Sequence, residues 1–149
     1  MRLSTKGRYA TRAMLDLAAH YGGGPINVRD ISCRQEISGR YLEQLLTPLR
    51  AAGLVRTTRG PHGGFTLAKP PSGIRLIEII QIMEGSTAPV ECIDDAGTCP
   101  RSESCVTRGV WEEVRNAADQ VLKSTTLQDL LERQEIAGQK AGTHIGNGI

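Results

Sequence analysis

Long apolar runs and catalytic motifs are both missing from this 149-residue sequence. No apolar stretch approaches the roughly 20 residues that a helix needs to span a bilayer, and no apolar core follows the positive charges near the N-terminus. The three histidines, His20, His62 and His144, are scattered, and no glycine loop suits a phosphate group. We therefore expect a cytoplasmic protein without a membrane segment, and not an enzyme.

Cysteine is scarce, and its placement is uneven. Of the four cysteines, Cys92, Cys99 and Cys105 share one short polar stretch, whereas Cys33 lies in a half-apolar helical setting that predicts a small buried residue. Because cytosolic thiols stay reduced, the clustered cysteines indicate ligands or redox sensors rather than disulfides. Their wide spacing differs from the C-x2-C knuckles of zinc ribbons, which weakens a structural zinc interpretation. An iron-sulfur cluster, which uses soft thiolate ligands, and plain redox thiols are the other interpretations.

The small net charge of +2 hides a strong asymmetry between the two halves of the chain. Residues 1–75 contain 12 Lys and Arg against 4 Asp and Glu, a net charge of +8. Residues 76–149 contain 6 against 12, a net charge of −6. Such asymmetry indicates a nucleic-acid partner for the basic half, although many proteins carry a solvated basic face that binds nothing.

The basic half predicts three helices. The first covers residues 4–21, the second begins after Asn27 and ends near residue 36, and the third covers 39–52 with Ser38 as its cap. An interior proline, Pro48, predicts a bend in the third helix. Two short helices joined by a tight turn are typical of a helix-turn-helix, in which the later helix enters the major groove of DNA.

The outward residues of the third helix suit base recognition. Arginine binds guanine, glutamine binds adenine, and glutamate accepts from the amino group of cytosine. A negative charge facing phosphates is repelled unless it makes a specific contact. Glu43 is therefore either a base discriminator, which we favour, or an internal partner of a nearby arginine.

The segment "LVRTTRGPHGGFTLAKP" predicts a β-hairpin, because alternating strand residues flank a turn rich in glycine and proline. A hairpin that follows a recognition helix is a wing. Its tip carries Arg59, and an arginine on a narrow loop suits the electronegative minor groove. Arg56 and Lys69 would flank the tip on phosphates. Helix-turn-helix and basic wing together favour DNA binding over a plain surface hairpin.

The acidic half predicts a helix from residue 76 that packs on the first helix, then the thiol stretch, then a helix of about 20 residues. An apolar stripe on the long helix finds too little partner surface in so small a domain, so we expect it to pair with a second copy in a homodimer. The alternative is that the long helix folds back on its own core. The stripe consists of Val106, Val110, Val114, Ala117, Val121 and Leu122, with Trp111 beside it.

The last part of the chain predicts a capped helix and a tail. A capping pattern at Thr126 starts the helix, with Leu130 and Leu131 buried. Residues 135–149 lack periodicity and predict a disordered tail. The resulting organisation is a winged helix-turn-helix over 1–84, a cluster-binding loop over 85–106, a dimerisation helix and short helix over 107–134, and the tail. The fold class is mainly α, with a small β-hairpin wing and a long C-terminal dimerisation helix.

Residues 1–134 resemble the IscR group of iron-sulfur winged-helix transcription regulators. The resemblance is carried by "MRLSTKGRYATRAMLDLA", "ISGRYLEQLL", "LRAAGLV", "RGPHGGF" and the three-cysteine stretch. It implies a cytoplasmic homodimer that acts as a repressor and binds a palindromic operator in double-stranded DNA. It also implies a 2Fe-2S or 4Fe-4S cluster held by Cys92, Cys99 and Cys105. The candidate DNA-binding residues are then Ser38, Arg40, Tyr41, Glu43, Gln44, Arg56, Arg59, Gly60 and His62.

The fourth cluster ligand departs from the family pattern. That pattern has a histidine three residues after the last cysteine, but this chain has Arg108, which stays protonated and cannot bind iron. The carboxylate that some relatives supply from the partner chain is replaced by Arg8. Three sources remain: a carboxylate of the same stretch (Asp94, Asp95 or Glu103), another group of the partner's N-terminal helix, or an exogenous ligand. An iron held by a labile ligand would be the first to be lost.

Two sensing mechanisms fit this fold. In the first, cluster binding orders the loop at the start of the dimer helix and sets the separation of the two recognition helices. In the alternative, a cluster-free regulator of the same fold senses through thiol oxidation or a partner protein. A small electron-transfer protein fits less well, because it has no use for a basic wing.

Overall fold

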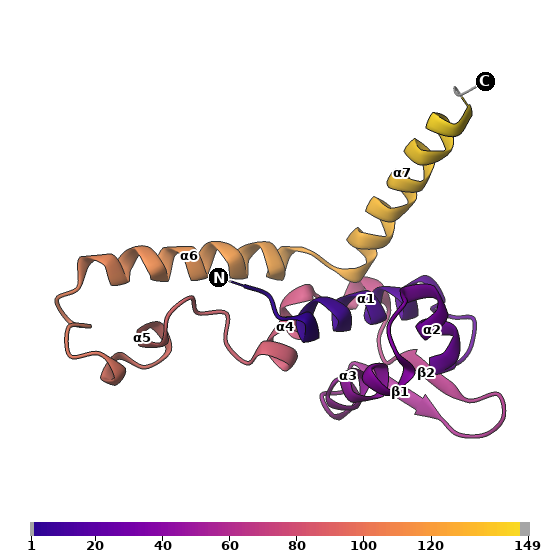
Figure 1. Cartoon of the computed structure of the whole chain (residues 1–149), viewed down its shortest axis with the longest axis horizontal. Helices are drawn as coiled ribbons and strands as arrows, with labels where there is room; N and C mark the ends of the chain where they lie inside the picture. The colour runs from indigo at the N-terminus through magenta and orange to yellow at the C-terminus, as the bar shows by residue number, and fades with distance from the viewer. Residues whose placement is uncertain (1, 147–149) are drawn as a thin grey trace.

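The computed structural model describes residues 2–146 and is mainly helical, with one two-stranded antiparallel hairpin. Figure 1 shows a winged N-terminal body, a long helix that runs from the thiol stretch back to this body, and a last helix that projects from it. The elements are α1 (Thr5–Ala19), α2 (Val28–Gln35), α3 (Gly39–Ala51), β1 (Val55–Thr58), β2 (Gly64–Leu67), η1 (Pro71–Gly73), α4 (Leu76–Glu84), α5 (Glu91–Asp94), η2 (Ala96–Thr98), α6 (Val106–Ser124) and α7 (Leu127–Gly146).

The three helices of the helix-turn-helix begin at side-chain caps. Ser4 Oγ accepts from the backbone N–H of residue 7, Asn27 Oδ1 from that of residue 30, and Ser38 Oγ from that of residue 41, at 2.9–3.2 Å. Each bond satisfies a backbone donor that has no partner within its helix. The helix α3 continues through Pro48, which lies close to its end, to Ala51. The predicted helices are therefore confirmed to within two residues.

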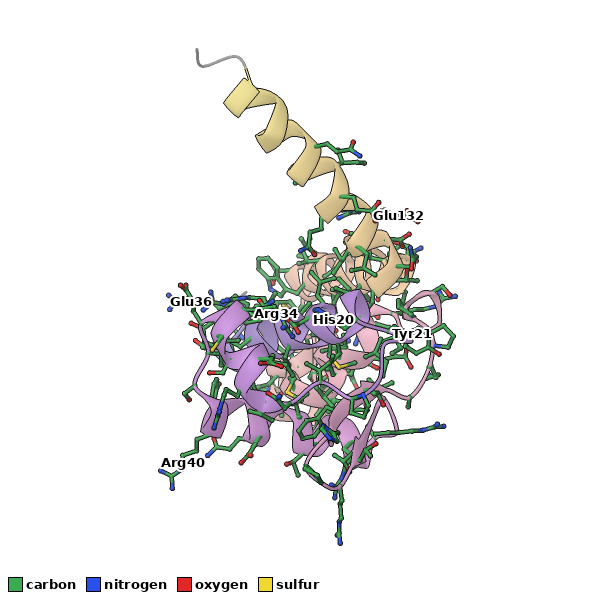
Figure 2. All side chains as sticks on the ribbon, turned by 90° about the vertical axis from the view of Figure 1, so that its right-hand side faces the viewer. His20, Tyr21, Arg34, Glu36, Arg40 and Glu132 are labelled. Carbon is green, nitrogen blue, oxygen red and sulfur yellow. The ribbon has the colours of Figure 1, made fainter. Side chains whose placement is uncertain are left out.

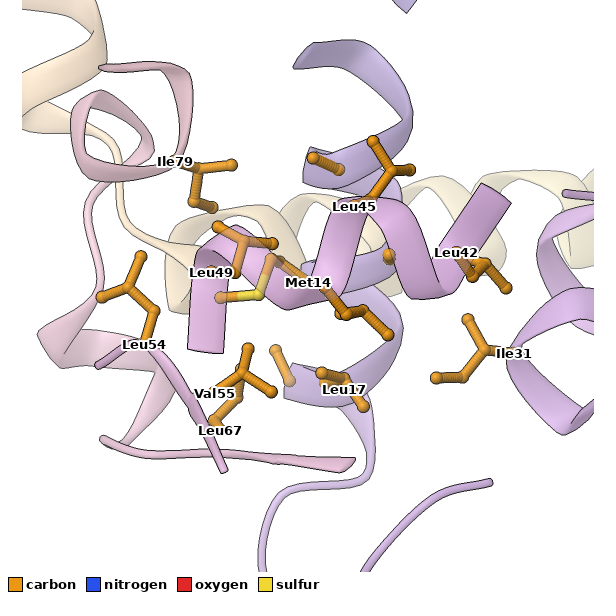
Figure 3. Close-up of a cluster of buried hydrophobic side chains, with 14 of the residues drawn as sticks. Met14, Leu17, Ile31, Leu42, Leu45, Leu49, Leu54, Val55, Leu67 and Ile79 are labelled. Carbon is orange, nitrogen blue, oxygen red and sulfur yellow. The ribbon is translucent and has the colours of Figure 1, made fainter. Parts of the chain in front are cut away.

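A single apolar core holds α1, α3, α4 and the hairpin together (Figure 3). Met14, Leu45 and Ile79 come from three different helices, and none is more than 1 % exposed. Removing such side chains from water stabilises the fold by roughly 1.5–3 kcal/mol each. The packing of α4 on α1 confirms the predicted contact between these helices. Leu127 of α7 is fully buried in the same core, so α7 begins on the winged body.

The wing is held at its base by a third extended segment. Ile26 and Phe65 exchange backbone hydrogen bonds of 2.8 and 2.9 Å, which adds residue 26 to the edge of the β1–β2 hairpin. A Cβ on Gly64 would lie 2.2 Å from the Ile26 carbonyl oxygen, and one on Gly63 would lie 2.1 Å from the Thr58 carbonyl oxygen. Only glycine permits these close approaches of one backbone to another.

The helix α7 corrects the prediction for the end of the chain. It starts at a reciprocal cap between Thr126 and Asp129 and continues to Gly146, through most of the segment predicted to be disordered. A capped helix that is already nucleated extends through residues such as Ala, Gln, Glu and Lys without apolar periodicity, and residues 132–146 contain no proline. Leu130 and Leu131 are half-buried. Residues 147–149 of the predicted tail lie outside the described residues.

Helices that could cross a bilayer are absent from residues 2–146, because none combines sufficient length with sufficient apolar character.

Candidate DNA interface and thiol loop

The outward face of α3 carries three of the predicted base-reading side chains. Arg40, Glu43 and Gln44 are exposed, and Arg40 projects away from the body of the molecule (Figure 2). Ser38 caps the helix, so its hydroxyl accepts from the Tyr41 N–H at 3.2 Å. The buried leucines of the opposite face fix the rotation of α3, and this rotation turns its polar face to solvent.

Tyr41 has a packing role that the sequence did not indicate. Its half-buried ring meets the Tyr9 ring edge to face, with centroids 6.1 Å apart. The Arg12 guanidinium lies 5.1 Å from the Tyr9 ring centroid and also donates to the Gln35 carbonyl oxygen, close to the end of α2. Pairs of aromatic rings and cation-π contacts each contribute about 0.5–1.5 kcal/mol. This stack joins the start of α3 to α1 and α2.

The Glu43 carboxylate is exposed, and no Lys or Arg side chain among residues 2–139, whose side chains the structure describes, forms an ion pair with it. Its backbone carbonyl oxygen, by contrast, accepts from the Thr47 hydroxyl at 2.7 Å. The structure therefore does not show the alternative in which Glu43 balances a nearby arginine. Base discrimination by Glu43 stays a prediction.

The wing tip is a projecting loop between β1 and β2. Arg59, Gly60 and His62 are exposed there, and Gly60 has a φ of 110°, in the region that favours glycine. Arg56 is exposed on β1. Lys69 instead forms an ion pair with Glu78 at 3.3 Å, which competes with its predicted contact to phosphate.

An ion pair with a buried carboxylate fixes the first two helices against each other, and no local sequence pattern indicates it. Asp16 of α1 is 4 % exposed and accepts from the Arg34 guanidinium at 2.8 and 2.9 Å and from Gln35 Nε2 at 3.0 Å. Burial raises the pKa of Asp16, but the hydrogen bonds from Arg34 and Gln35 and the charge of Arg34 outweigh it, so the pKa lies below its usual value. Figure 2 shows Arg34 beside His20, which lies 3.8 Å from the same carboxylate.

We use the name thiol loop for residues 85–105, which join α4 to α6. Cys92 lies in α5, Cys99 directly follows η2 and Cys105 directly precedes α6, and all three are half-buried. The part of the chain that the structure describes contains no group of three His, Cys, Asp or Glu side chains placed to hold a metal ion. The three predicted ligands thus share the loop but are not brought together into one site.

Three side chains of α6 hold the thiol loop against the helix, and we call them the strap residues: Arg108, Arg115 and Asp119. Arg108 makes the first of these contacts. Its Nε and Nη2 both donate to the Cys92 carbonyl oxygen, at 3.1 and 3.0 Å. Further along the same face of α6, Arg115 lies 4.0 Å from Asp94, and Asp119 accepts from the Thr87 hydroxyl at 2.6 Å. The arginine that stands in place of the family's histidine therefore holds a cysteine through its backbone rather than a metal.

Two of the three carboxylates predicted as substitute ligands have other partners. Asp94 contacts Arg115 and also accepts from the Ser86 hydroxyl. Asp95 accepts from the N–H of Gly97 at 2.9 Å. Glu103 is exposed.

Cys105 has an environment that favours its thiolate. The pKa of Cys105 lies below its usual value because of the hydrogen bond with the Thr107 hydroxyl, at 3.0 Å, and of that with the backbone of Arg108. A helix start has this effect in general, and the thiolate is the form that binds metals and attacks oxidants. Cys33 corrects the sequence prediction: it is exposed on α2 rather than buried, because the inward face of this short helix is filled by Ile31.

The apolar side of α6 is exposed. Val106 is 88 %, Val121 63 % and Trp111 42 % exposed, and no residue of this helix is buried. The alternative prediction, in which the helix folds back on its own core, is therefore wrong. The side of α6 opposite to the strap residues carries five apolar side chains: Val106, Val110, Val114, Ala117 and Val121.

The family model described as an iron-dependent transcriptional regulator, Rrf2, matches residues 3–133. The chain belongs to the Rrf2 family. The HTH-type transcriptional regulator IscR of Escherichia coli is 40 % identical over 144 residues, which cover 97 % of this chain and 88 % of that protein. The Rrf2 match and this relative make the chain a DNA-binding transcriptional regulator and not an enzyme.

Two solved structures of Rrf2-type relatives support the fold. CymR, described as the global cysteine regulator of B. subtilis, gives a TM-score of 0.76 at 40 % identity, covering 89 % of this chain and 98 % of that one. IscR of T. potens gives a TM-score of 0.76 at 40 % identity, covering 92 % and 90 %. They confirm a mainly helical winged-helix architecture with a small hairpin and a long C-terminal helix.

Proposed function

We propose that this chain is a cytoplasmic homodimeric regulator that reads a palindromic operator and responds to iron, iron-sulfur or redox status through Cys92, Cys99 and Cys105. The observation that carries the proposal is the strapped thiol loop. The loop is tied along one side of α6, and the opposite side of the same helix is apolar and exposed. A change at the thiols is thereby placed next to the surface that joins two copies.

DNA is read by the two elements that the winged body presents. The α3 helix lies in the major groove, where Arg40, Glu43 and Gln44 face the base edges, while the Tyr9–Tyr41 contact and Ser38 hold the start of the helix. The wing reaches the adjacent minor groove, with Arg59 at its exposed tip and His62 beside it. Arg56 and the backbone of Gly60 lie along the phosphates.

A homodimer follows from the exposed stripe of α6. Side chains such as Val121 and Trp111 leave water only against another molecule, and a second copy provides the same stripe. A two-fold dimer then presents two α3 helices to two half-sites, which is why we expect a palindromic operator.

The donor set of the thiol loop fits three corners of an iron-sulfur cluster. Three thiols on a loop of polar residues supply soft ligands, and the environment of Cys105 favours the thiolate that ligation needs. A bound cluster would supply a group that responds to iron supply and oxidants. The protein supplies the loop that must close around it, while Arg108 keeps Cys92 beside the start of α6. The fourth corner falls to a ligand other than residue 108.

A cluster-free thiol regulator is the second candidate. It is favoured by the separate placement of the three thiols and by the stabilised thiolate of Cys105. The likeness to CymR, described as a cysteine regulator, points the same way. In this alternative, Cys105 is the first thiol to react with an oxidant, because the thiolate is the nucleophilic form.

Native mass spectrometry of anaerobically purified protein, with its visible spectrum, tests the two candidates. A dimer with an iron-sulfur mass increment and a thiolate-to-iron absorption band is expected. Cys92→Ser, Cys99→Ser and Cys105→Ser should each lose the increment, whereas the matched control Cys33→Ser should keep it. A metal-free dimer that still binds DNA would refute the cluster and leave the thiol regulator.

A further inference from the structure

A cavity of about 600 Å³ lies between the winged body and α6. The segment before α1, the helix α4, residues 86–89 and the second half of α6 contribute to it. Its lining is mostly apolar, with polar groups from Arg2, Glu84, Ser86 and Thr87. This size and lining are those of a pocket that receives one large side chain or a small ligand. The apolar part consists of Leu3, Ile80, Ala88, Pro89, Ala118, Val121 and Leu122.

The cavity is continuous with the exposed side of α6. Val121 belongs both to the cavity lining and to the stripe, and it is 63 % exposed. The strap residues Arg108, Arg115 and Asp119 lie on the side of α6 away from Val121. Residues 86–89, at the start of the thiol loop, form one wall of the cavity and leave Val121 exposed.

The spacing of apolar residues on α6 matches a two-fold pairing of the helix with itself. Trp111, Val114, Ala118 and Val121 follow the alternating steps of three and four residues that form the seam of a coiled coil. The series is also symmetric about Asn116. When two copies of α6 run antiparallel across an axis at this residue, Trp111 faces Val121 of the other copy, and Val114 faces Ala118.

Large and small side chains are complementary in this register. The bulky Trp111 meets the position beside the cavity, and Val114 meets the small Ala118. An indole ring buries a large apolar area, while its N–H requires an acceptor. The cavity supplies both, because Glu84, Ser86 and Thr87 contribute oxygen atoms among its apolar walls.

We propose that the cavity beside Val121 receives the Trp111 side chain of a second copy of this chain. The inference rests on the proposed homodimer and adds to it the register and the anchoring contact. Both cavities of the dimer are filled at once, since a two-fold axis repeats the contact.

Trp111 is the only tryptophan in the sequence, so its fluorescence reports this contact directly. The wild-type protein should sediment as a dimer with blue-shifted emission, and dilution to monomer should shift the emission to the red. Val121→Glu keeps the tryptophan but places a charge at the mouth of the cavity. It should raise the dimer dissociation constant and shift the emission to the red at concentrations where the wild type is dimeric.

Trp111→Ala should raise the dimer dissociation constant at least about 30-fold, as removal of a central aromatic anchor does. Gln120→Ala is the matched control, because Gln120 is exposed on the same helix outside the seam. Circular dichroism verifies that each variant is folded. A variant that does not fold is replaced by Trp111→Phe, which should weaken the dimer less than the loss of the ring.

The outcomes separate the two proposals. A wild-type monomer would refute the homodimer itself. A wild-type dimer whose emission is that of a solvent-exposed indole, or whose dissociation constant is the same in Trp111→Ala, would overturn the cavity contact and leave the homodimer intact.

Discussion

The winged body and the α6 arm are built in opposite ways. In the body, capped helices pack around a core in which Met14 and Leu45 are almost completely removed from water. In the arm, α6 buries no residue, and the thiol loop is tied to it by polar contacts such as Arg108 to Cys92. The body therefore carries its stability within one chain, whereas the arm depends on what binds to it. This division suits a regulator whose DNA-binding body keeps one structure, while changes at α6 alter how two such bodies are placed relative to each other.

The largest expected effect on stability comes from truncating a core side chain of the winged body. Leu45→Ala removes a side chain that is 1 % exposed in α3 and should lower the free energy of unfolding by about 2–5 kcal/mol. Gln120→Ala, at an exposed polar position of α6 outside the apolar stripe, should change it by less than about 0.5 kcal/mol. Urea unfolding at one fixed protein concentration compares them. Equal effects would remove the distinction between body and arm.

The ion pair between the buried Asp16 and Arg34 should make the stability of the body depend on pH. The folded pKa of Asp16 is lowered, so its contribution is present above the unfolded pKa and is lost as the pH falls through the folded pKa. Asp16→Asn should cost roughly 1–3 kcal/mol at neutral pH, since hydrogen bonds to a charged group are lost. Unfolding measured between about pH 7 and pH 2 should show a smaller loss of stability in the variant than in the wild type.

Glu113→Gln is the control for this measurement, because Glu113 is exposed on α6. If it flattened the pH profile as much as Asp16→Asn does, the dependence would come from surface carboxylates in general.

Substitutions in the wing should lower the affinity for DNA, and substitutions on α3 should lower the sequence selectivity. Arg59→Ala should weaken operator binding about tenfold, whereas Glu43→Ala should broaden the set of sequences bound, because a wrong base no longer faces an unpaired carboxylate. Fluorescence anisotropy at one salt concentration, on the operator and on single-base variants, measures both. Arg133→Ala removes an exposed charge from α7 and serves as the control. Wild-type behaviour of both variants would show that α3 and the wing are placed wrongly.

The smallest expected effect concerns the contact between Arg108 of α6 and the thiol loop. Arg108→Ala removes two hydrogen bonds to the Cys92 carbonyl, worth about 1 kcal/mol, and should leave global unfolding almost unchanged. Amide exchange within residues 85–105 of the metal-free protein should become several-fold faster, as hydrogen-exchange mass spectrometry would show. Arg101→Ala, at an exposed position of the same loop, should not change it. Unchanged exchange in the Arg108 variant would mean that the loop is held elsewhere.

Local patterns predicted most of the fold. The caps at Asn27 and Ser38 and the leucine stripe of α3 placed the helices, since both depend on residues within one or two turns. The tail was predicted wrongly because a capped helix extends without an apolar stripe, and α7 reaches Gly146. Cys33 was assigned to the interior because a half-apolar helix of two turns does not define its inward side by sequence alone.

The sequence by itself determined the winged-helix body, the exposed polar side of α3, the basic wing and the presence of three clustered thiols. Each of these features depends on residues that are close together in the sequence. Only the tertiary structure decided that Asp16 meets Arg34, that Tyr9 supports Tyr41 and that Arg108 holds the carbonyl of Cys92. These partners lie 16 to 32 residues apart in the chain, and their meeting depends on how whole helices pack. Local periodicity carries no information about such distances.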